Sequence, residues 1–393
     1  NEIFRNGSFS NHQLTLSGGT GKTRVFSSLG LYNEEGITLR TDMSRVTFRS
    51  NVDYADDKFS LSVNTNLGYT KRNFQQSSTT NSLGNPFLTA AVAVPYASLF
   101  KQGTNNYATG IGTLYAAANQ LDLTKYDMNY NNQIKTTLGV TANYKFTDHL
   151  TGSVTTGIDF RETQNTNYGS KLAFNRTVST SITGKAGFQT EGLTRFFRGT
   201  FRPSVTYRNS FGTKHDVEVT ALTEYLREYN KSMSQTGYGT DPKRPNTSAV
   251  IQPANATNQL YHSVGGSKSE NSLMSGLLTA RYTFDGKYTV TGSYREDGSS
   301  KLPESNRWQG FYAVGAIWDA KKEKFIDDIK MINMLRVKLS YGGSGNADNF
   351  PGGNYPYQNS YSQGSYSGLN TIIATYPGNP DMKWESTFVT NFG

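Results

Sequence analysis

The amino-acid sequence predicts an all-β fold, a partial transmembrane antiparallel β-barrel. Three observations favour this fold class: apolar and polar residues alternate over long segments, short and long connections alternate along the chain, and no apolar stretch approaches the roughly 20 residues of a membrane-spanning helix. The 393 residues include 25 Tyr, 22 Phe and no Cys, with 35% hydrophobic residues overall. Because Tyr is apolar in its ring and polar at its hydroxyl, it favours interfaces between oil and water.

The alternation is clearest in the segment that begins at Lys58. Every second residue from Phe59 to Tyr69 is apolar or Thr, and the residues between them are Ser, Asn or Gly. The pattern runs for roughly 12 residues, about the length that a tilted strand needs to cross a bilayer, whereas strands of soluble sandwiches have about 5–6 residues. About 13 such strands are predicted, beginning near His12, Thr23, Ser44, Lys58, Gln133, Leu150, Thr194, His215, Leu273, Tyr288, Phe311, Met334 and Lys383.

Charged residues fall on the polar side of this alternation. A Lys or Arg that faced lipid at mid-depth would cost about 2–4 kcal/mol, so a lipid-exposed strand must sort its residues in this way. The side chains predicted to face the lumen or its rim are Arg45, Arg49, Lys135, Arg198, Arg202, Arg295 and Arg336. The net charge of +9 is scattered without a basic block, which argues against a nucleic-acid partner.

The connections between the predicted strands alternate in length. The short connections are residues 18–22, 55–57, 147–149, 209–214 and 285–287, with a somewhat longer one at 319–333. Between them lie very long connections at 75–132, 161–193, 230–272 and 342–382, and intermediate ones at 33–43 and 296–310. Short turns at one end and long loops at the other are typical of outer-membrane barrels, in which the turns are periplasmic and the loops extracellular. Residues 1–393 are therefore predicted to form one barrel unit.

Three segments need a separate interpretation. Pro203 lies inside a predicted strand, where it removes a ladder donor, and this suggests a bulge or an irregular edge. The segment 311–318 is apolar on both sides, so the pattern does not say which side faces lipid. Residues 83–100 are interpreted as a short helix packed at the barrel mouth, with a ligand contact as the alternative.

Motifs for catalysis or metal binding are weak. Residues 17–23 resemble a phosphate-binding loop, but Leu16 occupies a position where that motif needs Gly, and a strand rather than a helix follows. A Gly-rich hairpin turn explains them. The four His residues are far apart, and none has a ligand-type companion four positions away. We predict no enzyme activity, no cofactor and no metal site.

Tyrosines in the predicted long loops are candidate contacts for a substrate or a partner. Tyr offers stacking and hydrogen bonding at small entropic cost, although loop packing or a rim of interface aromatics explains the same residues. The candidates are Tyr96, Tyr238, Tyr261, Tyr355, Tyr357, Tyr361 and Tyr366.

A series of short motifs resembles the barrel of the SusC/RagA-type TonB-dependent transporters. The motifs are SGG at 17–19, SLG at 28–30, EGI at 35–37, DGSSK at 297–301, NRW at 306–308, Trp318, EKF at 323–325, LR at 335–336, SYG at 340–342, GN at 345–346 and NPDMKWE at 379–385. Each motif is weak alone, but their order and spacing over the whole chain make the resemblance specific. The motifs at 297–300 and 379–385 are interpreted as strand-end structure, without a binding role.

The resemblance implies a 22-stranded barrel with an N-terminal plug, of which this chain supplies about 13 strands. It implies import of oligosaccharides or peptides across the outer membrane, a SusD-like lipoprotein lid and energy from TonB–ExbB–ExbD, and it leaves open a dimer of transporter–lid pairs. The resemblance places the plug outside this chain. Because an open sheet edge cannot face lipid, either further strands at both ends lie outside this chain or other chains complete the wall, and we expect the first. The alternatives are a passive porin, a structural or adhesive outer-membrane barrel, and a soluble carbohydrate-binding protein.

Overall fold

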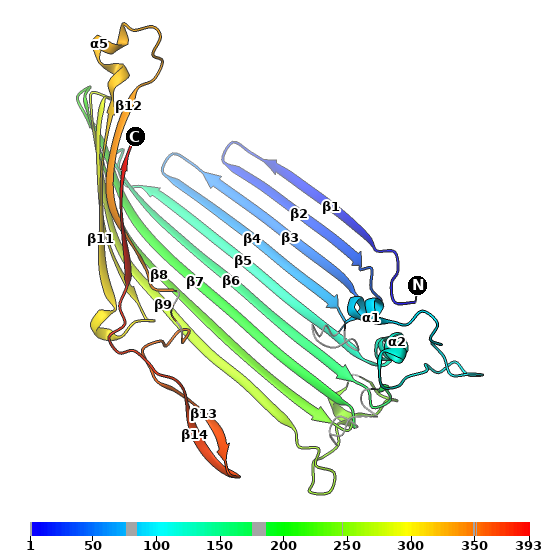
Figure 1. Cartoon of the computed structure of the whole chain (residues 1–393). Coiled ribbons are helices and arrows are strands. Elements are labelled where there is room, and N and C mark those ends of the chain that lie inside the picture. Colours follow the sequence, from blue (N-terminus) through cyan, green and yellow to red (C-terminus); the bar gives the residue numbers. More distant parts are fainter. Residues whose placement is uncertain (1, 76–84, 175–185, 246, 349, 351) are drawn as a thin grey trace.

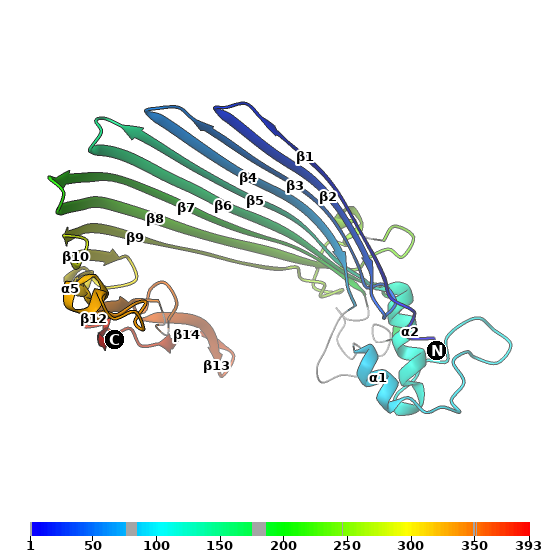
Figure 2. The ribbon, with the colours of Figure 1, turned by 90° about the horizontal axis from the view of Figure 1, so that it is seen from above.

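A computed structural model of the chain confirms the all-β fold (Figure 1). It describes residues 2–75, 85–174, 186–245, 247–348, 350 and 352–393. Thirteen strands form one antiparallel sheet in the order β1 to β12 followed by β15, and β13 and β14 form a separate two-stranded sheet. The predicted number of wall strands is therefore confirmed. Figure 2 shows that the large sheet is strongly curved, with β1 near one margin and β15 near the other.

The bounds of the elements are as follows. The strands are β1 (Ser8–Gly19), β2 (Thr23–Glu35), β3 (Asp42–Ala55), β4 (Phe59–Asn73), β5 (Met128–Lys145), β6 (Leu150–Gly169), β7 (Phe188–Phe211), β8 (His215–Tyr238), β9 (Ser263–Phe284), β10 (Tyr288–Ser299), β11 (Trp308–Asp319), β12 (Arg336–Asn346), β13 (Ser360–Tyr366), β14 (Leu369–Tyr376) and β15 (Glu385–Phe392). The helices are α1 (Pro86–Val92), α2 (Ala116–Tyr126), α5 (Lys324–Asp327) and the 3-10 turns η1 (Thr113–Tyr115), η2 (Ser248–Val250), η3 (Glu304–Asn306) and η4 (Ala320–Lys322). Among the helices of the described residues, none has the length and apolarity to cross a bilayer.

The predicted alternation of short and long connections is confirmed. Residues 20–22, 56–58, 146–149, 212–214 and 285–287 are tight turns, and 320–335 is the longer connection at the same end of the sheet. The other connections gather at the opposite end, which we call the long-loop end (Figure 1). In an antiparallel sheet of successive hairpins, alternate connections lie at the same end. Connections that alternate in length along the sequence are therefore sorted into short ones at one end and long ones at the other.

The strands at the middle of the sheet are longer than the sequence predicted. The loops predicted at 161–193 and 230–272 are shorter in the structure, because β6 and β8 continue to Gly169 and Tyr238, and β7 and β9 begin at Phe188 and Ser263. The extra residues are mostly Thr, Asn, Ser, Gln and Glu on both sides of the strands. Their apolar alternation stops while the backbone ladder continues, so the hydrophobic pattern underestimates the strand length.

Pro203 lies in the interior of β7 without a bulge, so the predicted irregularity is wrong. The register between β7 and β8 is the same before and after Pro203, and only the pairs of Arg202 and Pro203 are missing from this ladder. On the other side, Pro203 pairs with Val154 in an unbroken ladder. Long ladders on both neighbours hold the register, so the missing donor removes bonds locally without shifting the strand.

The predicted helix within 83–100 is confirmed for the described part, as α1. Asn85 caps its N-terminus, where the side-chain oxygen accepts hydrogen bonds from the backbone N–H groups of Phe87 and Leu88. Pro86 occupies the first helical position, where its missing N–H costs nothing. Leu83 and Gly84 lie outside the described residues.

The β3–β4 turn is closed by one carboxylate. Asp56 Oδ1 accepts hydrogen bonds from the backbone N–H groups of Lys58 and Phe59 at 3.0 and 2.8 Å, and Oδ2 accepts from the Tyr54 hydroxyl at 3.0 Å. The hydrogen bonds from the two backbone N–H groups have the largest effect, followed by that from the Tyr54 hydroxyl. Together they hold the pKa of Asp56 below its usual value.

We expect the unfolding free energy of the Asp56→Asn variant to fall less steeply with decreasing pH than that of the wild type. A carboxyl whose pKa is lower in the folded state stabilises the fold above its unfolded pKa, and this contribution is lost as the pH falls through the folded pKa. Asn keeps an acceptor oxygen but does not titrate. Urea midpoints of the full-length protein between about pH 6 and about pH 3 would measure the two slopes. Identical slopes for wild type and variant would contradict the assignment.

Candidate functional site

The wide sheet has one apolar face, and the register shows how it is built. Paired residues in neighbouring strands project to the same side, so a chain of pairs defines a row. One such row runs through Phe59, Tyr144, Gly152, Val205, Ala221, Leu278, Tyr294 and Tyr312. We call this side the apolar face and the other side the polar face. The ambiguous β11 is thereby resolved, since Tyr312 and Val314 lie on the apolar face and Phe311 and Ala313 on the polar face.

The apolar face has the height of a bilayer core. On β6 the apolar-face positions from Leu150 to Phe160 carry no charge, and Glu162 follows. Those 11 residues span about 34 Å along the strand and about 25 Å when the strand is tilted as in a barrel, which matches the apolar band of outer-membrane proteins. At the long-loop end, the first charged residues of this face are Glu35, Asp42, Lys71, Glu162, Arg195, Arg227, Glu270 and Glu296. We call the uncharged zone the apolar band.

All seven predicted lumen-facing cations lie on the polar face. Arg45 and Arg49 pair with Thr70 and Asn66 of β4, and Arg198 pairs with Asp159 of β6. The other four cations also occupy polar-face positions of their strands: Lys135, Arg202, Arg295 and Arg336. The polar face is thus chemically what a lumen wall requires, while its contact with a lumen stays a prediction.

Arg–Glu pairs connect β7 to β8 on the polar face. Arg198 pairs with Glu228, the Arg202 and Glu224 side chains approach to 3.8 Å, and Arg208 and Glu218 to 2.7 Å. Such exposed pairs each contribute little to stability, about 0–1 kcal/mol. Their effect is to orient the guanidinium groups and to leave the wall nearly neutral along these two strands.

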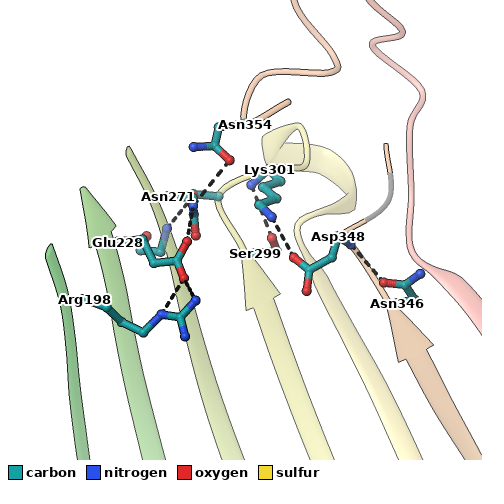
Figure 3. A network of polar contacts seen from close by, with 10 residues as sticks. Arg198, Glu228, Asn271, Ser299, Lys301, Asn346, Asp348 and Asn354 are labelled. Atoms are coloured by element: carbon teal, nitrogen blue, oxygen red, sulfur yellow. Dashed lines mark hydrogen bonds and ion pairs between the residues drawn. The ribbon is translucent and has the colours of Figure 1, made fainter. Parts of the chain in front are cut away.

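The first of these pairs belongs to a polar network at the long-loop end, which Figure 3 shows. Glu228 accepts from Arg198 and also from Asn271 Nδ2, at 3.1 Å. The same Asn271 nitrogen donates to Asn354 Oδ1 at 3.3 Å. Three strands and a loop from the distant segment 347–384 are therefore joined through one asparagine.

A second set of contacts lies beside the first. Lys301 Nζ donates to Asp348 Oδ1 at 2.7 Å, and the backbone N–H of Asp348 donates to Asn346 Oδ1 at 3.0 Å. The backbone N–H of Lys301 donates to Ser299 Oγ at 3.3 Å. These residues lie at the ends of β10 and β12 (Figure 3). We call the two sets together the wall network.

The wall network borders a cavity of about 560 Å³ on the polar face of β7 to β12. Arg295 donates through Nε to both carboxylate oxygens of Asp297, at 2.7 and 2.9 Å, and through Nη2 to Ser275 Oγ at 3.0 Å. Phe311 and Trp384 add two rings that meet edge to face at 5.8 Å. Asp297 is 8% exposed and Phe311 6%, so these two side chains form the floor of the cavity.

The charges around this cavity are paired. Arg198, Arg295 and Lys301 each contact a carboxylate, so the lining is polar but not strongly of one sign. Hydrogen-bond donors and acceptors next to two aromatic rings suit a neutral or dipolar polar solute. This lining suits the binding or guidance of such a solute.

Of the predicted cations, only Arg198 and Arg295 line this cavity. Arg336 lies at the short-turn end, where its Nε is 3.3 Å from Asp319 Oδ2. The sequence did not single out Glu228 and Asn271, which join Arg198 to its surroundings, or Asp348, which accepts from Lys301.

The seven candidate tyrosines lie in three connections at the long-loop end. Tyr96 follows α1, Tyr238 and Tyr261 flank the β8–β9 connection, and the remaining four, Tyr355, Tyr357, Tyr361 and Tyr366, lie in 347–384. Tyr355 contributes to the wall region, because its hydroxyl accepts from the backbone N–H of Glu270 at 3.4 Å. The structure does not gather the seven into one surface, and a binding role stays a prediction.

The motif at 379–385 bonds to the motif at 306–308. Trp384 Nε1 donates to the carbonyl of Arg307 at 2.9 Å, and Asn306 Nδ2 donates to the carbonyls of Asp381 and Met382 at 3.3 and 3.1 Å. These bonds tie the start of β15 to the β10–β11 connection.

Comparison with known proteins identifies relatives of the whole chain. No protein-family model matches the sequence. The chain is 25% identical to TonB-dependent receptor P39 of Formosa agariphila over 392 residues, which cover 97% of this chain and 34% of that receptor. It is 29% identical to TonB-dependent receptor SusC of Bacteroides thetaiotaomicron over 134 residues, or 32% of this chain and 13% of SusC.

The chain is similar to proteins named TonB-dependent receptors, SusC among them. The fold agrees: the RagAB peptide importer in its closed-closed state superposes with a TM-score of 0.76 and 20% identity, over 100% of this chain and 42% of that chain. The sheet thus has the fold of part of a transporter barrel, and its apolar and polar faces are the two sides of that sheet. The chain spans about a third of the length of P39, with which it aligns almost throughout.

Proposed function

We propose that this chain is a wall segment of an outer-membrane, TonB-dependent importer of peptides or oligosaccharides. The observation that carries the proposal is the sorting of residues across the sheet, with an uncharged apolar band on one face and paired charges on the other. The apolar face then contacts lipid, the polar face lines the lumen, and the long-loop end with the wall network opens to the outside.

In this proposal the wall itself does no chemistry. It encloses a plug supplied by another part of the full-length protein, and TonB–ExbB–ExbD energises release through that plug. A SusD-like surface lipoprotein covers the outer opening. The names of similar proteins support the TonB-dependent import, since RagAB is a peptide importer and P39 and SusC are TonB-dependent receptors. A dimer of wall–lid pairs is compatible with this arrangement.

Uptake by intact cells tests the proposal. A strain that lacks the full-length gene, complemented with the wild-type gene, is expected to take up fluorescent peptides or oligosaccharides only when the gene and TonB are both present. Comparing the uptake of peptides with that of oligosaccharides identifies the class of solute that is imported. Uptake that persists without TonB would instead support a passive porin, and extraction of the protein without detergent would contradict the membrane location.

A further inference from the structure

A second cavity lies at the long-loop end, on the apolar face of the sheet. Its volume is about 520 Å³, and it is lined by residues of β3, β4, β5 and α2. The strand residues around it include Asp42, Tyr69, Lys71, Tyr130 and Asn132, all at apolar-face positions. Figure 1 shows α2 at this end of the sheet. We call this space the α2 cavity.

Hydrogen bonds hold α2 against the ends of the strands. Gln75, which follows β4, donates through Nε2 to Thr124 Oγ1 at 2.9 Å, and its Oε1 accepts from Gln120 Nε2 at 3.1 Å. The guanidinium of Arg40 donates to two carbonyls at the C-terminal end of α2, at 2.7 and 3.2 Å. A cation is favourable at that end of a helix. The α2 cavity is therefore fixed in shape by its own chain.

Two acceptor atoms at the α2 cavity have no donor. Gln120 is 3% exposed, and within the described residues neither its Oε1 nor the buried Asn132 Oδ1 accepts a hydrogen bond. A buried acceptor without a partner is destabilising. The terminal torsions of Asn and Gln are soft, so a small rotation turns such an oxygen toward a ligand. The site thus suits a ligand that brings hydroxyl or N–H groups.

The rest of the lining narrows the ligand class. The charged residues around the cavity are two cations and two carboxylates, Arg40, Lys71, Asp42 and Asp127, so neither sign dominates. Tyr69 and Tyr130 add aromatic rings. Hydroxyl groups both donate and accept, and the apolar side of a sugar ring packs against an aromatic ring. A sugar therefore matches the α2 cavity better than a simple ion.

The α2 cavity begins where the apolar band ends. On β4 the apolar-face positions up to Tyr69 are uncharged, and Lys71 is the first charged one. Just below, Leu67 and Ile134 are 41% and 49% exposed, and Ile134 pairs with Tyr69. In the proposed orientation this boundary lies at the head groups of the outer leaflet. A sugar bound there has acyl chains within reach of the apolar band.

We propose that the α2 cavity binds the sugar head group of a glycolipid in the outer leaflet, with its acyl chains along Leu67 and Ile134. The inference rests on the proposed function in one respect, because it requires the apolar face to contact lipid. It concerns the outside of the wall, so the bound glycolipid is a resident of the membrane and not a transported solute.

Lipid binding by the full-length transporter tests the inference. The protein is immobilised in detergent micelles that contain phosphatidylcholine, and radiolabelled lipid A, an acylated glucosamine disaccharide, is added as the probe. We expect saturable binding of one lipid A that depends on this cavity. Phosphatidylglycerol and the deacylated disaccharide should each compete at least tenfold less well than unlabelled lipid A, because the first lacks the sugar and the second lacks the acyl chains.

Variants assign this binding to the α2 cavity. Asn132→Leu removes one of the unpaired acceptors, and Lys71→Met removes an exposed ammonium that forms no ion pair in the described part of the chain. Each should weaken lipid A binding at least tenfold. Gln164→Leu is the matched control for the first, since Gln164 pairs with Asn132 on the same face outside the cavity, and Lys268→Met on β9 is the control for the second. Both controls should bind as wild type.

Three results would overturn the inference: wild-type binding by both cavity variants, equal competition by phosphatidylglycerol, which would reduce recognition to charge, or equal competition by the deacylated disaccharide, which would make the ligand a soluble sugar. TonB-dependent uptake by intact cells is measured in the same variants and should not change. Normal uptake together with failed lipid binding would leave the proposed function standing, whereas extraction of the protein without detergent would remove both.

Discussion

Val154→Arg is expected to destabilise the folded protein by about 2–4 kcal/mol, because it places a guanidinium near the middle of the apolar band. Val154 lies halfway along the uncharged stretch of β6, on the apolar face, and pairs there with Ala142 of β5 and Pro203 of β7. At this depth the Arg side chain reaches neither the charged rim at the long-loop end nor the turns at the other. The fraction of full-length protein folded in phosphatidylcholine vesicles during a urea titration measures the loss.

Ser153→Arg is the matched control for this variant. Ser153 is the adjacent residue on β6 and lies on the polar face, where its paired neighbours are Asn143 and Ser204. We expect its unfolding free energy to change by less than about 1 kcal/mol, since an Arg there remains solvated. Equal losses in the two variants would show that the two faces do not differ in solvent, and the membrane assignment of the sheet would fail.

The second large effect is expected for Asp297→Ala. This carboxylate is almost buried and accepts two hydrogen bonds from Arg295, whose other nitrogen holds the Ser275 hydroxyl. Removing it leaves a partly buried guanidinium without a counter-charge, and we expect a loss of about 2 kcal/mol after allowing for the one-third exposure of Arg295. Urea midpoints of the full-length protein provide the measurement.

A double-mutant cycle distinguishes the ion pair from simple loss of packing. Arg295→Ala combined with Asp297→Ala should cost less than the sum of the two single variants, by about 1–2 kcal/mol, because neither charge is left unpaired. Additive losses would mean that the two side chains contribute independently and that the floor of the cavity is not organised by their pairing.

The sequence predicted the wall well because its physical signal is local. A residue on a strand has the same orientation as the residues two positions away, so Phe59 and Leu61 reveal the apolar face without knowledge of their neighbours. The same rule assigned Arg198 and Arg202 to the polar face, and the pairing confirms that they share it. The lengths of the connections supplied the topology. In a sheet made of successive hairpins, alternate connections lie at the same end, so this inference needs no information on long-range contacts.

The wall network could not be predicted in this way because it depends on register. Glu228 is next to Arg198 only because β7 and β8 pair with a particular offset, and Asn271 joins them through a second offset. A single strand pattern does not contain either offset. Arg295 and Asp297 are the exception, because residues two apart on one strand share a face and opposite charges there already indicate a pair.

The hairpin of β13 and β14 was missed for a different reason. Its residues lack a sustained apolar alternation, and Gly and Ser interrupt both strands, so the segment resembled an uninterrupted loop. The positive φ at Ser367 and Gly368 marks the turn, but Ser-Gly is a weaker hairpin signal than Asn-Gly.

The length of the central strands has a consequence for access. On β7 the apolar band ends near Phe197, yet the strand begins at Phe188, so in the proposed orientation the wall rises about 20 Å above the hydrocarbon before it reaches the loops. This extension of the strands places the rim of the wall above the lipid head groups. In that orientation, the rim of the wall and the loops above it are reached from the side, through water, and not through the head-group layer.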